Sequence, residues 1–284
     1  MIQGIYVAAL IATLLASLII GGVILGNSSK KEYLFYILLF LLTLPMSYLS
    51  IGYVRIPFDA WFHSIMTHEG WYTFLTVFYA PLTEEPAKLW PLLIPFFYRR
   101  LTKENVVKTA LALGLGFGVG EIWYLAWRLT FRPDIVALPW YQLGGFINER
   151  LLVCAIHGAF TAVTIYIWKR YGTRAGIIGS VLLHFFGNFP IYLAGINLFG
   201  WGKTAWQYIL SIYIIIYAFL MAVILLYFQF ENREVIRQIL KGEHVCPECG
   251  KKYRGRWLSV NWLTKTYEKC PFCKKWHWVS YIKT

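Results

Sequence analysis

The sequence predicts an all-α polytopic membrane protein with about seven transmembrane helices and a small C-terminal zinc-ribbon domain. Three observations lead to this fold class. The chain of 284 residues is 58% hydrophobic, long apolar runs recur along it, and its end is polar, basic and rich in cysteine. A soluble domain of this length carries far more polar residues. We therefore divide the chain into a transmembrane domain, residues 1–230, and a tail domain, residues 231–284.

Seven apolar runs have the length that a spanning helix needs. At 1.5 Å per residue, crossing ~30 Å of hydrocarbon takes about 20 residues. The runs cover residues 5–25, 33–53, 71–97, 106–129, 146–168, 176–198 and 205–230. No basic residue precedes the first run and no small-residue cleavage site follows it, so we expect a retained span and not a signal peptide.

The loop charges predict the orientation of these spans. If the runs alternate in direction, the most basic loops share one side with the tail; they contain residues 30–31, 99–103 and 169–174. Basic loops face the cytoplasm. We therefore expect a multi-pass protein of the cell membrane with its N-terminus outside and its C-terminus in the cytoplasm. The net charge of +13 then reflects topology and anionic lipid headgroups.

The tail carries two Cys-x-x-Cys pairs, Cys246–Cys249 and Cys270–Cys273, separated by twenty residues. Each pair can form a knuckle with two thiolates, and two knuckles complete a tetrahedral zinc site. A cytosolic location argues against disulfides. We predict a structural zinc ion, Zn2+, that supplies much of the folding free energy of this short domain. The nearby His244 and His277 are then expected to be surface residues.

The partners of the tail are less defined. Residues 230–284 contain twelve Lys or Arg against five Asp or Glu, interspersed with tryptophans. Such a mixture suits either nucleic acid or anionic lipid. In a membrane protein we favour lipid headgroups or a docked cytosolic protein, and we do not expect nucleic acid.

Ionisable residues interrupt four of the apolar runs. They are Glu84, Glu85 and Lys88 in the third run, Glu121 in the fourth, His157 in the fifth, and His184 with the amide Asn188 in the sixth. Ionisable residues inside a membrane are costly and usually functional. Each lies several turns from the end of its run, so we expect all of them to meet in one cavity near the bilayer centre.

Helical spacing refines this expectation. Lys88 follows Glu84 by four residues and Glu85 by three, so its ammonium can pair with either carboxylate. His184 and Asn188 are four apart and face the same way. Adjacent buried carboxylates titrate jointly, which is typical of a general acid/base pair. The alternative is a purely structural Glu–Lys ion pair that stabilises the packing of the helices.

Small residues lie near Glu121 and His157 in the sequence. Glycines at 114, 116, 118 and 120 form two small-xxx-small pairs just before Glu121, and such faces allow helix backbones to approach closely. Cys154 lies one turn before His157, and we interpret it as a packing residue.

Four motifs in this region resemble those of the PrsW family of intramembrane proteases, which is related to the CAAX prenyl endopeptidases. They cover residues 82–90, 116–124, 154–158 and 182–188. The resemblance implies hydrolysis of a peptide bond in a small membrane-anchored substrate such as an anti-sigma factor. By position, Glu84 and Glu85 match the paired glutamates, Glu121 the second motif, and His157 and His184 the two histidines.

The chain departs from the family pattern at two positions and in its tail. Ile122 stands where the family often has Asn, and Asn188 stands where PrsW proteins often have Asp. The His184-xxx-Asn188 motif instead resembles the last motif of the CAAX group, and a zinc ribbon is not part of the core pattern. The substrate preference of PrsW proteins is therefore not carried over.

The residues favour a glutamate-type intramembrane endopeptidase. We assign Glu84 as the base that activates water, held by Glu85 and Lys88. Glu121 and His157 would position the water or move its proton, while His184 and Asn188 would donate to the oxyanion. A catalytic zinc held by His157, His184 and a glutamate is the rival mechanism.

Two other classes remain as alternatives. The same residues could serve a proton-coupled transporter, although the sequence has no internal repeat. A scaffold without catalytic activity, whose ribbon recruits a partner, is the third possibility. Burying ionisable groups in the membrane costs free energy, and a scaffold would gain nothing in return.

Overall fold

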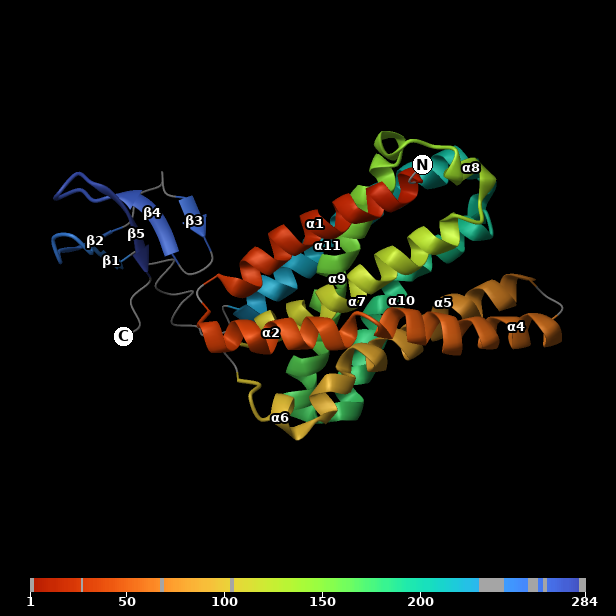
Figure 1. Ribbon diagram of the computed structural model, residues 1–284, viewed down its shortest axis with the longest axis horizontal. Helices are drawn as coiled ribbons and strands as arrows, with labels where there is room; N and C mark the ends of the chain where they lie inside the picture. Colours follow the sequence, from red (N-terminus) through yellow and green to blue (C-terminus); the bar gives the residue numbers. More distant parts are fainter. Residues whose placement is uncertain are drawn as a thin grey trace. The chain divides into compact units, whose positions relative to one another are not determined.

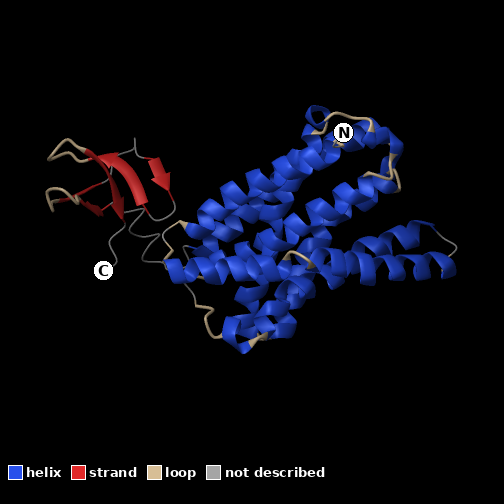
Figure 2. Ribbon diagram, viewed as in Figure 1, coloured by secondary structure: helices blue, strands red, loops and turns tan. Residues whose placement is uncertain are grey.

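The computed structural model describes residues 3–26, 28–66, 69–102, 105–229, 243–254, 260–262 and 265–280. The chain divides into two compact units, Met1–Leu225 and Leu226–Thr284. The first unit is built of helices and the second contains small antiparallel strands (Figure 2). The described part of the chain is therefore mostly helical and ends in small strands that carry the cysteines, as the predicted fold class requires.

The first unit opens with two long helical segments. α1 (Gly4–Leu25) is followed by α2 (Lys30–Thr43), α3 (Met46–Tyr48), the π-helical segment η1 (Leu49–Arg55) and α4 (Ile56–Ile65), which continue one another. A capping box starts α2, because Ser29 and Glu32 each accept a hydrogen bond from the other's backbone N–H. The wide turns of η1 belong to a class that is frequent at functional sites.

The third segment is broken by proline. α5 (Glu69–Leu89) contains Pro81 and Pro86 and gives way to the 3₁₀ segment η2 (Trp90–Leu93) and to α6 (Pro95–Tyr98). The predicted run 71–97 is therefore not one continuous helix. Proline at positions 91 and 95 explains the break, because each lacks the N–H that an α-helix would use.

The remaining helices of this unit form its centre and one side. They are α7 (Val106–Leu129), α8 (Pro133–Val136), the 3₁₀ segment η3 (Trp140–Gln142), α9 (Gly144–Tyr171), α10 (Thr173–Gly195), the 3₁₀ segment η4 (Leu198–Gly200) and α11 (Gly202–Gln229). α7 is the most buried of the long helices and packs against α1, α2 and α9 (Figure 1).

Among the described residues, six helical stretches are long and apolar enough to cross a membrane. They are Gly4–Leu25, Lys30–Ile65, Val106–Leu129, Gly144–Tyr171, Thr173–Gly195 and Gly202–Phe228. These agree with six of the seven predicted runs. α5, which carries Glu84, Glu85 and Lys88, is not among them.

The glycines of α7 lie against two neighbours. A Cβ at Gly114 or Gly118 would collide with α9, at Gly158 and Cys154 respectively, and a Cβ at Gly120 would collide with the chain at Leu44. The predicted pairs 114/118 and 116/120 therefore face α9 and the α2 segment, respectively. Close approach on both sides fixes the position of Glu121, one residue further on.

The second unit contains two small sheets. β1 (Glu243–Val245) pairs with β2 (Lys252–Arg254), and β3 (Val260–Trp262), β4 (Lys265–Lys269) and β5 (Trp276–Ser280) form an antiparallel sheet in the order β3-β4-β5. Tyr267 lies opposite Trp278, and Lys269 lies opposite Trp276. The Cys246–Cys249 turn joins β1 to β2, and the Cys270–Cys273 turn joins β4 to β5.

Candidate functional site

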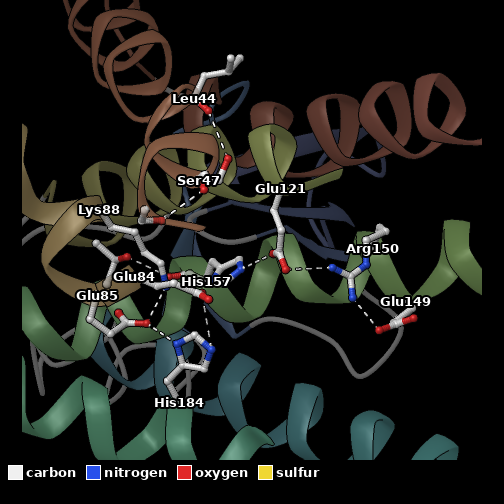
Figure 3. Close-up of polar contacts among 12 residues, drawn as sticks. Leu44, Ser47, Glu84, Glu85, Lys88, Glu121, Glu149, Arg150, His157 and His184 are labelled. Carbon is white, nitrogen blue, oxygen red and sulfur yellow. Dashed lines mark hydrogen bonds and ion pairs between the residues drawn. The ribbon is translucent and has the colours of Figure 1, made fainter. Parts of the chain in front are cut away.

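The ionisable residues predicted from the sequence converge in the first unit (Figure 3). Glu84, Glu85 and Lys88 come from the last turns of α5, and they meet Glu121 of α7, His157 of α9 and His184 of α10. All are buried except Glu121, which is half-buried. Residues separated by up to a hundred positions thus form a single polar cluster.

Lys88 lies at the centre of this cluster. Its Nζ is 2.6 Å from Glu85 Oε1 and 2.8 Å from His157 Nδ1. The rings of Phe117 and Phe160 lie 5.0 and 5.5 Å from the same nitrogen, which suits a desolvated cation. An ammonium group can only donate, so Nδ1 of His157 accepts and its ring proton is on Nε2.

His157 connects the lysine to a second ion pair. Its Nε2 donates to Glu121 Oε2 at 2.9 Å, and Glu121 Oε1 accepts from Arg150 Nη1 at 3.2 Å. Arg150 is buried and also donates to Glu149 at 2.5 Å. The geometry fixes the tautomer and orientation of His157 from both sides.

Glu84 and His184 face each other without a direct hydrogen bond. His184 Nδ1 donates to Glu85 Oε1 at 2.6 Å, while its Nε2 lies 3.8 Å from Glu84 Oε2. The second separation is too long for a hydrogen bond and short enough for one water molecule to contact both atoms. Phe160 stacks on the imidazole at 4.8 Å between ring centroids.

Each of the three glutamates from α5 and α7 has a cationic partner. Glu85 pairs with Lys88, Glu121 pairs with Arg150, and Glu84 Oε1 accepts from Arg55 Nη1 at 3.3 Å. Buried carboxylates require such partners, because an unpaired charge in a low-dielectric interior is strongly destabilising. Of the two pairings predicted for Lys88, the structure selects Glu85.

Asn188 is the one predicted site residue that stays outside this network. It lies one turn beyond His184 on α10 and is half-buried, and its side chain makes no hydrogen bond to another residue that the structure describes. Its amide is free to donate to a bound group. Pro190, two residues later, leaves the carbonyl of Phe186 without an intrahelical donor, and Tyr213 of α11 donates to that oxygen at 2.7 Å.

The four tail cysteines form a candidate metal centre. All four Sγ atoms lie within 4.8 Å of one another, with Cys246 to Cys273 at 3.6 Å and Cys249 to Cys270 at 3.8 Å. Four sulfurs arranged tetrahedrally around zinc at about 2.3 Å are about 3.8 Å apart, so the cluster has the size of a zinc site. Among the described residues it is the only group of three or more His, Cys, Asp or Glu whose ligand atoms converge in this way.

The two knuckles share one backbone design. Gly250 and Lys274, each directly after the second cysteine of its pair, have φ of 65° and 59°. In each knuckle a backbone N–H donates to the first sulfur: Cys249 N lies 3.4 Å from Cys246 Sγ, and Phe272 N lies 3.4 Å from Cys270 Sγ. Burial, which raises the pKa of the Cys270 thiol, is outweighed by the N–H groups of Cys273 and Phe272, which lower that pKa to about 7.

No family model, curated protein or solved structure matches the chain. Function therefore has to be inferred from the contacts above and from the sequence motifs.

Arg55 and Arg150 are the site residues that sequence reasoning missed. Arg150 precedes His157 by seven residues on α9, two helical turns that bring both side chains to one face, and this spacing could have revealed it. Arg55 lies two residues beyond the second apolar run, where the sequence suggests a loop, but it ends the π-helical segment η1 and lies inside a continuous helix. A charged residue at the edge of an apolar run gives no signal by itself.

His244 also differs from expectation. It was predicted to be a surface residue, but it is buried, and its Nδ1 contacts the fully buried carboxylate of Glu268. The reason is strand alternation: His244 is the central residue of β1 and lies opposite the buried Tyr253. His277 is half-buried, and neither of its ring nitrogens has a partner among the described residues.

Proposed function

We propose that the membrane unit is an intramembrane endopeptidase that hydrolyses a peptide bond of a membrane-anchored substrate with a water molecule activated by Glu84. The observation that carries this proposal is the 3.8 Å separation between Glu84 Oε2 and His184 Nε2. A water between two acceptors donates one hydrogen to each and directs its lone pair away from both. That orientation suits attack on a carbonyl carbon.

The contacts support different roles for the two adjacent glutamates. Glu85 Oε1 accepts from both Lys88 and His184, so Glu85 holds these two side chains in place. Glu84 Oε2 faces His184 and is the oxygen available to take a proton from water. Glu121 orients His157, which in turn accepts from Lys88. Asn188, whose amide is uncommitted within the described part of the chain, is the proposed donor to the oxyanion.

The resemblance to PrsW proteins and CAAX endopeptidases supports the same reaction. Its matched glutamates and histidines, Glu84, Glu85, Glu121, His157 and His184, are the residues that converge here. We propose membership of that group. The proposed location is the cell membrane, with the N-terminus outside and the ribbon in the cytoplasm, as the loop charges predict.

The zinc-dependent alternative for the membrane site fits the contacts less well. A metal held by His157, His184 and a glutamate needs free ring nitrogens directed at one point. His157 has both nitrogens engaged, by Lys88 and Glu121, and the Lys88 ammonium lies between the ligands that such a metal would use. In the tail, by contrast, we propose a structural zinc bound by the four cysteines, since their spacing fits zinc and fills its coordination shell.

A proton-coupled carrier is the second candidate, favoured by one observation. Ionisable groups form an almost continuous chain from Arg55 through Lys88 to Glu149. Proton relays use such chains. However, Arg55 and Arg150 lie in this chain, and a guanidinium in a protein does not give up its proton, so neither side chain can relay one.

A cleavage assay tests the proposed function. The purified chain in liposomes is offered a panel of single-span and prenylated peptides, and products are identified by mass spectrometry. We expect Glu84→Gln to lower turnover about 10³-fold, since Gln keeps the shape but cannot accept the proton, and Asn188→Ala to lower it about 10²-fold. Asp134→Asn, at an exposed ion pair, is the matched control. Full activity of Glu84→Gln would refute the assignment.

A further inference from the structure

We propose that the outer face of the β4–β5 sheet in the ribbon binds an anionic phospholipid surface. This aromatic face consists of Tyr267, Lys269, Trp276 and Trp278. It is separate from the proposed peptidase site and assigns a partner to the tail.

Strand alternation defines the face. On β5, Trp276 and Trp278 are 53% and 49% exposed, whereas the intervening His277 is half-buried and Val279 is buried. On β4, Glu268 is buried and Lys269 is exposed. In a small antiparallel sheet the solvent-facing positions are usually polar, so two exposed tryptophans here need a partner.

The charge around these rings is positive. Lys269 lies directly opposite Trp276, and Lys274 and Lys275 end the turn that leads into β5. These three lysines are exposed, and Lys251 and Lys252 are exposed elsewhere in the unit. Among the residues whose exposure is described, Glu248 is the exposed acid of this unit, and it pairs with Lys275. An aromatic surface with a lysine rim complements anionic headgroups, because Trp and Tyr rings favour the membrane interface and each basic residue adds about fivefold to partitioning.

Ring packing favours lipid over single-stranded nucleic acid. Tyr267 stacks on Trp276, with ring centroids 5.5 Å apart and ring planes inclined at 24°, and its centroid lies 5.2 Å from that of Trp278. Nucleobases bind such platforms through free ring faces, and Tyr267 already covers one face of Trp276. Insertion at a bilayer interface needs only apolar ring edges and a polar N–H near the headgroups. Covalent attachment to a candidate span, α11, further raises the effective concentration of bilayer.

Fluorine NMR on the full chain tests the proposal. The protein is labelled with 5-fluorotryptophan and placed in nanodiscs of phosphatidylcholine alone or with phosphatidylserine, and Trp276→Phe and Trp278→Phe assign the two resonances. A gadolinium-chelating lipid broadens nuclei near the headgroups. We expect both resonances to broaden with phosphatidylserine present and to recover as salt is raised.

Charge variants supply the matched comparison. Lys269→Gln with Lys274→Asn should lower the docked-to-free ratio about 25-fold, that is, fivefold for each lysine; Asn tolerates the left-handed backbone at position 274. Lys203→Gln, outside the ribbon, should change nothing. Equal broadening in both lipids, or no broadening in either, would overturn the proposal. Broadening by an added oligothymidylate but not by anionic lipid would assign the face to nucleic acid instead.

Discussion

Lys88 shows how one residue can determine the chemistry of a buried site. Its ammonium contacts a carboxylate, an imidazole and two aromatic rings. The ammonium supplies the positive charge that balances the Glu85 carboxylate, and it comes from a residue three positions further along the same helix.

Removing that cation should be costly. We expect Lys88→Met to lower the free energy of unfolding by about 3–5 kcal/mol, because it leaves the Glu85 charge buried and unpaired. Lys88→Met combined with Glu85→Gln should recover much of the loss. Urea unfolding in detergent of the parent protein, the two single variants and the double variant gives the coupling free energy between the two side chains. Strictly additive changes in the free energy of unfolding would show that the two side chains do not form the pair described here.

Arg55 provides a second prediction at the residue scale. Its guanidinium is 30% exposed, and it contacts the buried Glu84 at 3.3 Å. Because this contact positions the proposed base, Arg55→Gln should lower turnover about 10²-fold, while Arg55→Lys should retain more activity. Arg132→Gln removes an exposed pair and is the control. Peptide cleavage by the three variants is the measurement, and equal activities would remove Arg55 from the site.

At the scale of elements, the approach of α7 to α9 holds Glu121 against His157. A side chain at Gly114 would collide with the backbone of Gly158. Gly114→Ala should therefore destabilise the protein by about 1–3 kcal/mol and lower activity by separating the two helices. Gly21→Ala in α1 meets nothing within 4 Å and should be neutral or stabilising. Thermal unfolding of both variants tests the contrast; equal melting temperatures would contradict it.

Apolar runs predicted the helices well and their ends poorly. The second run was expected to stop at residue 53, but the helix continues through η1 to Ile65, since Arg55 lies inside it and is neutralised by Glu84. The third run was expected to continue to 97, and prolines ended it at Leu89. Composition shows where the chain is apolar over a given length. Charge pairing between helices depends on contacts in three dimensions, which the sequence does not show directly.

Convergence of the site was predictable for a related reason. Ionisable residues several turns inside apolar runs avoid contact with lipid and therefore face one another in the protein interior. Glu84, Glu121 and His157 were expected together for this reason. Which atoms meet was not predictable: Lys88 could have paired with either glutamate, and nothing in the spacing of His184 showed that its Nδ1 would be taken by Glu85.

For the whole molecule, the two units should be separable. A chain truncated before residue 231 keeps every residue of the membrane cluster and loses all four tail cysteines. We expect the full chain to carry one zinc ion and the truncated chain none, as measured by elemental analysis. The truncated chain should still cleave peptide in the presence of a chelator. Unchanged metal content after truncation would place a metal elsewhere, and chelator-sensitive activity would favour the zinc mechanism.

α11 looks in the sequence like an interchangeable hydrophobic anchor, yet the structure gives it a defined task. Tyr213 and Tyr217 donate to carbonyls of Phe186 and Leu183 on α10, on either side of the turn that carries His184. Replacing α11 with an arbitrary apolar segment of equal length would preserve membrane insertion but remove these two hydrogen bonds to α10. Hydrophobicity alone therefore does not make such a segment exchangeable, and sequence variation along α11 should be constrained at two tyrosines and permissive between them.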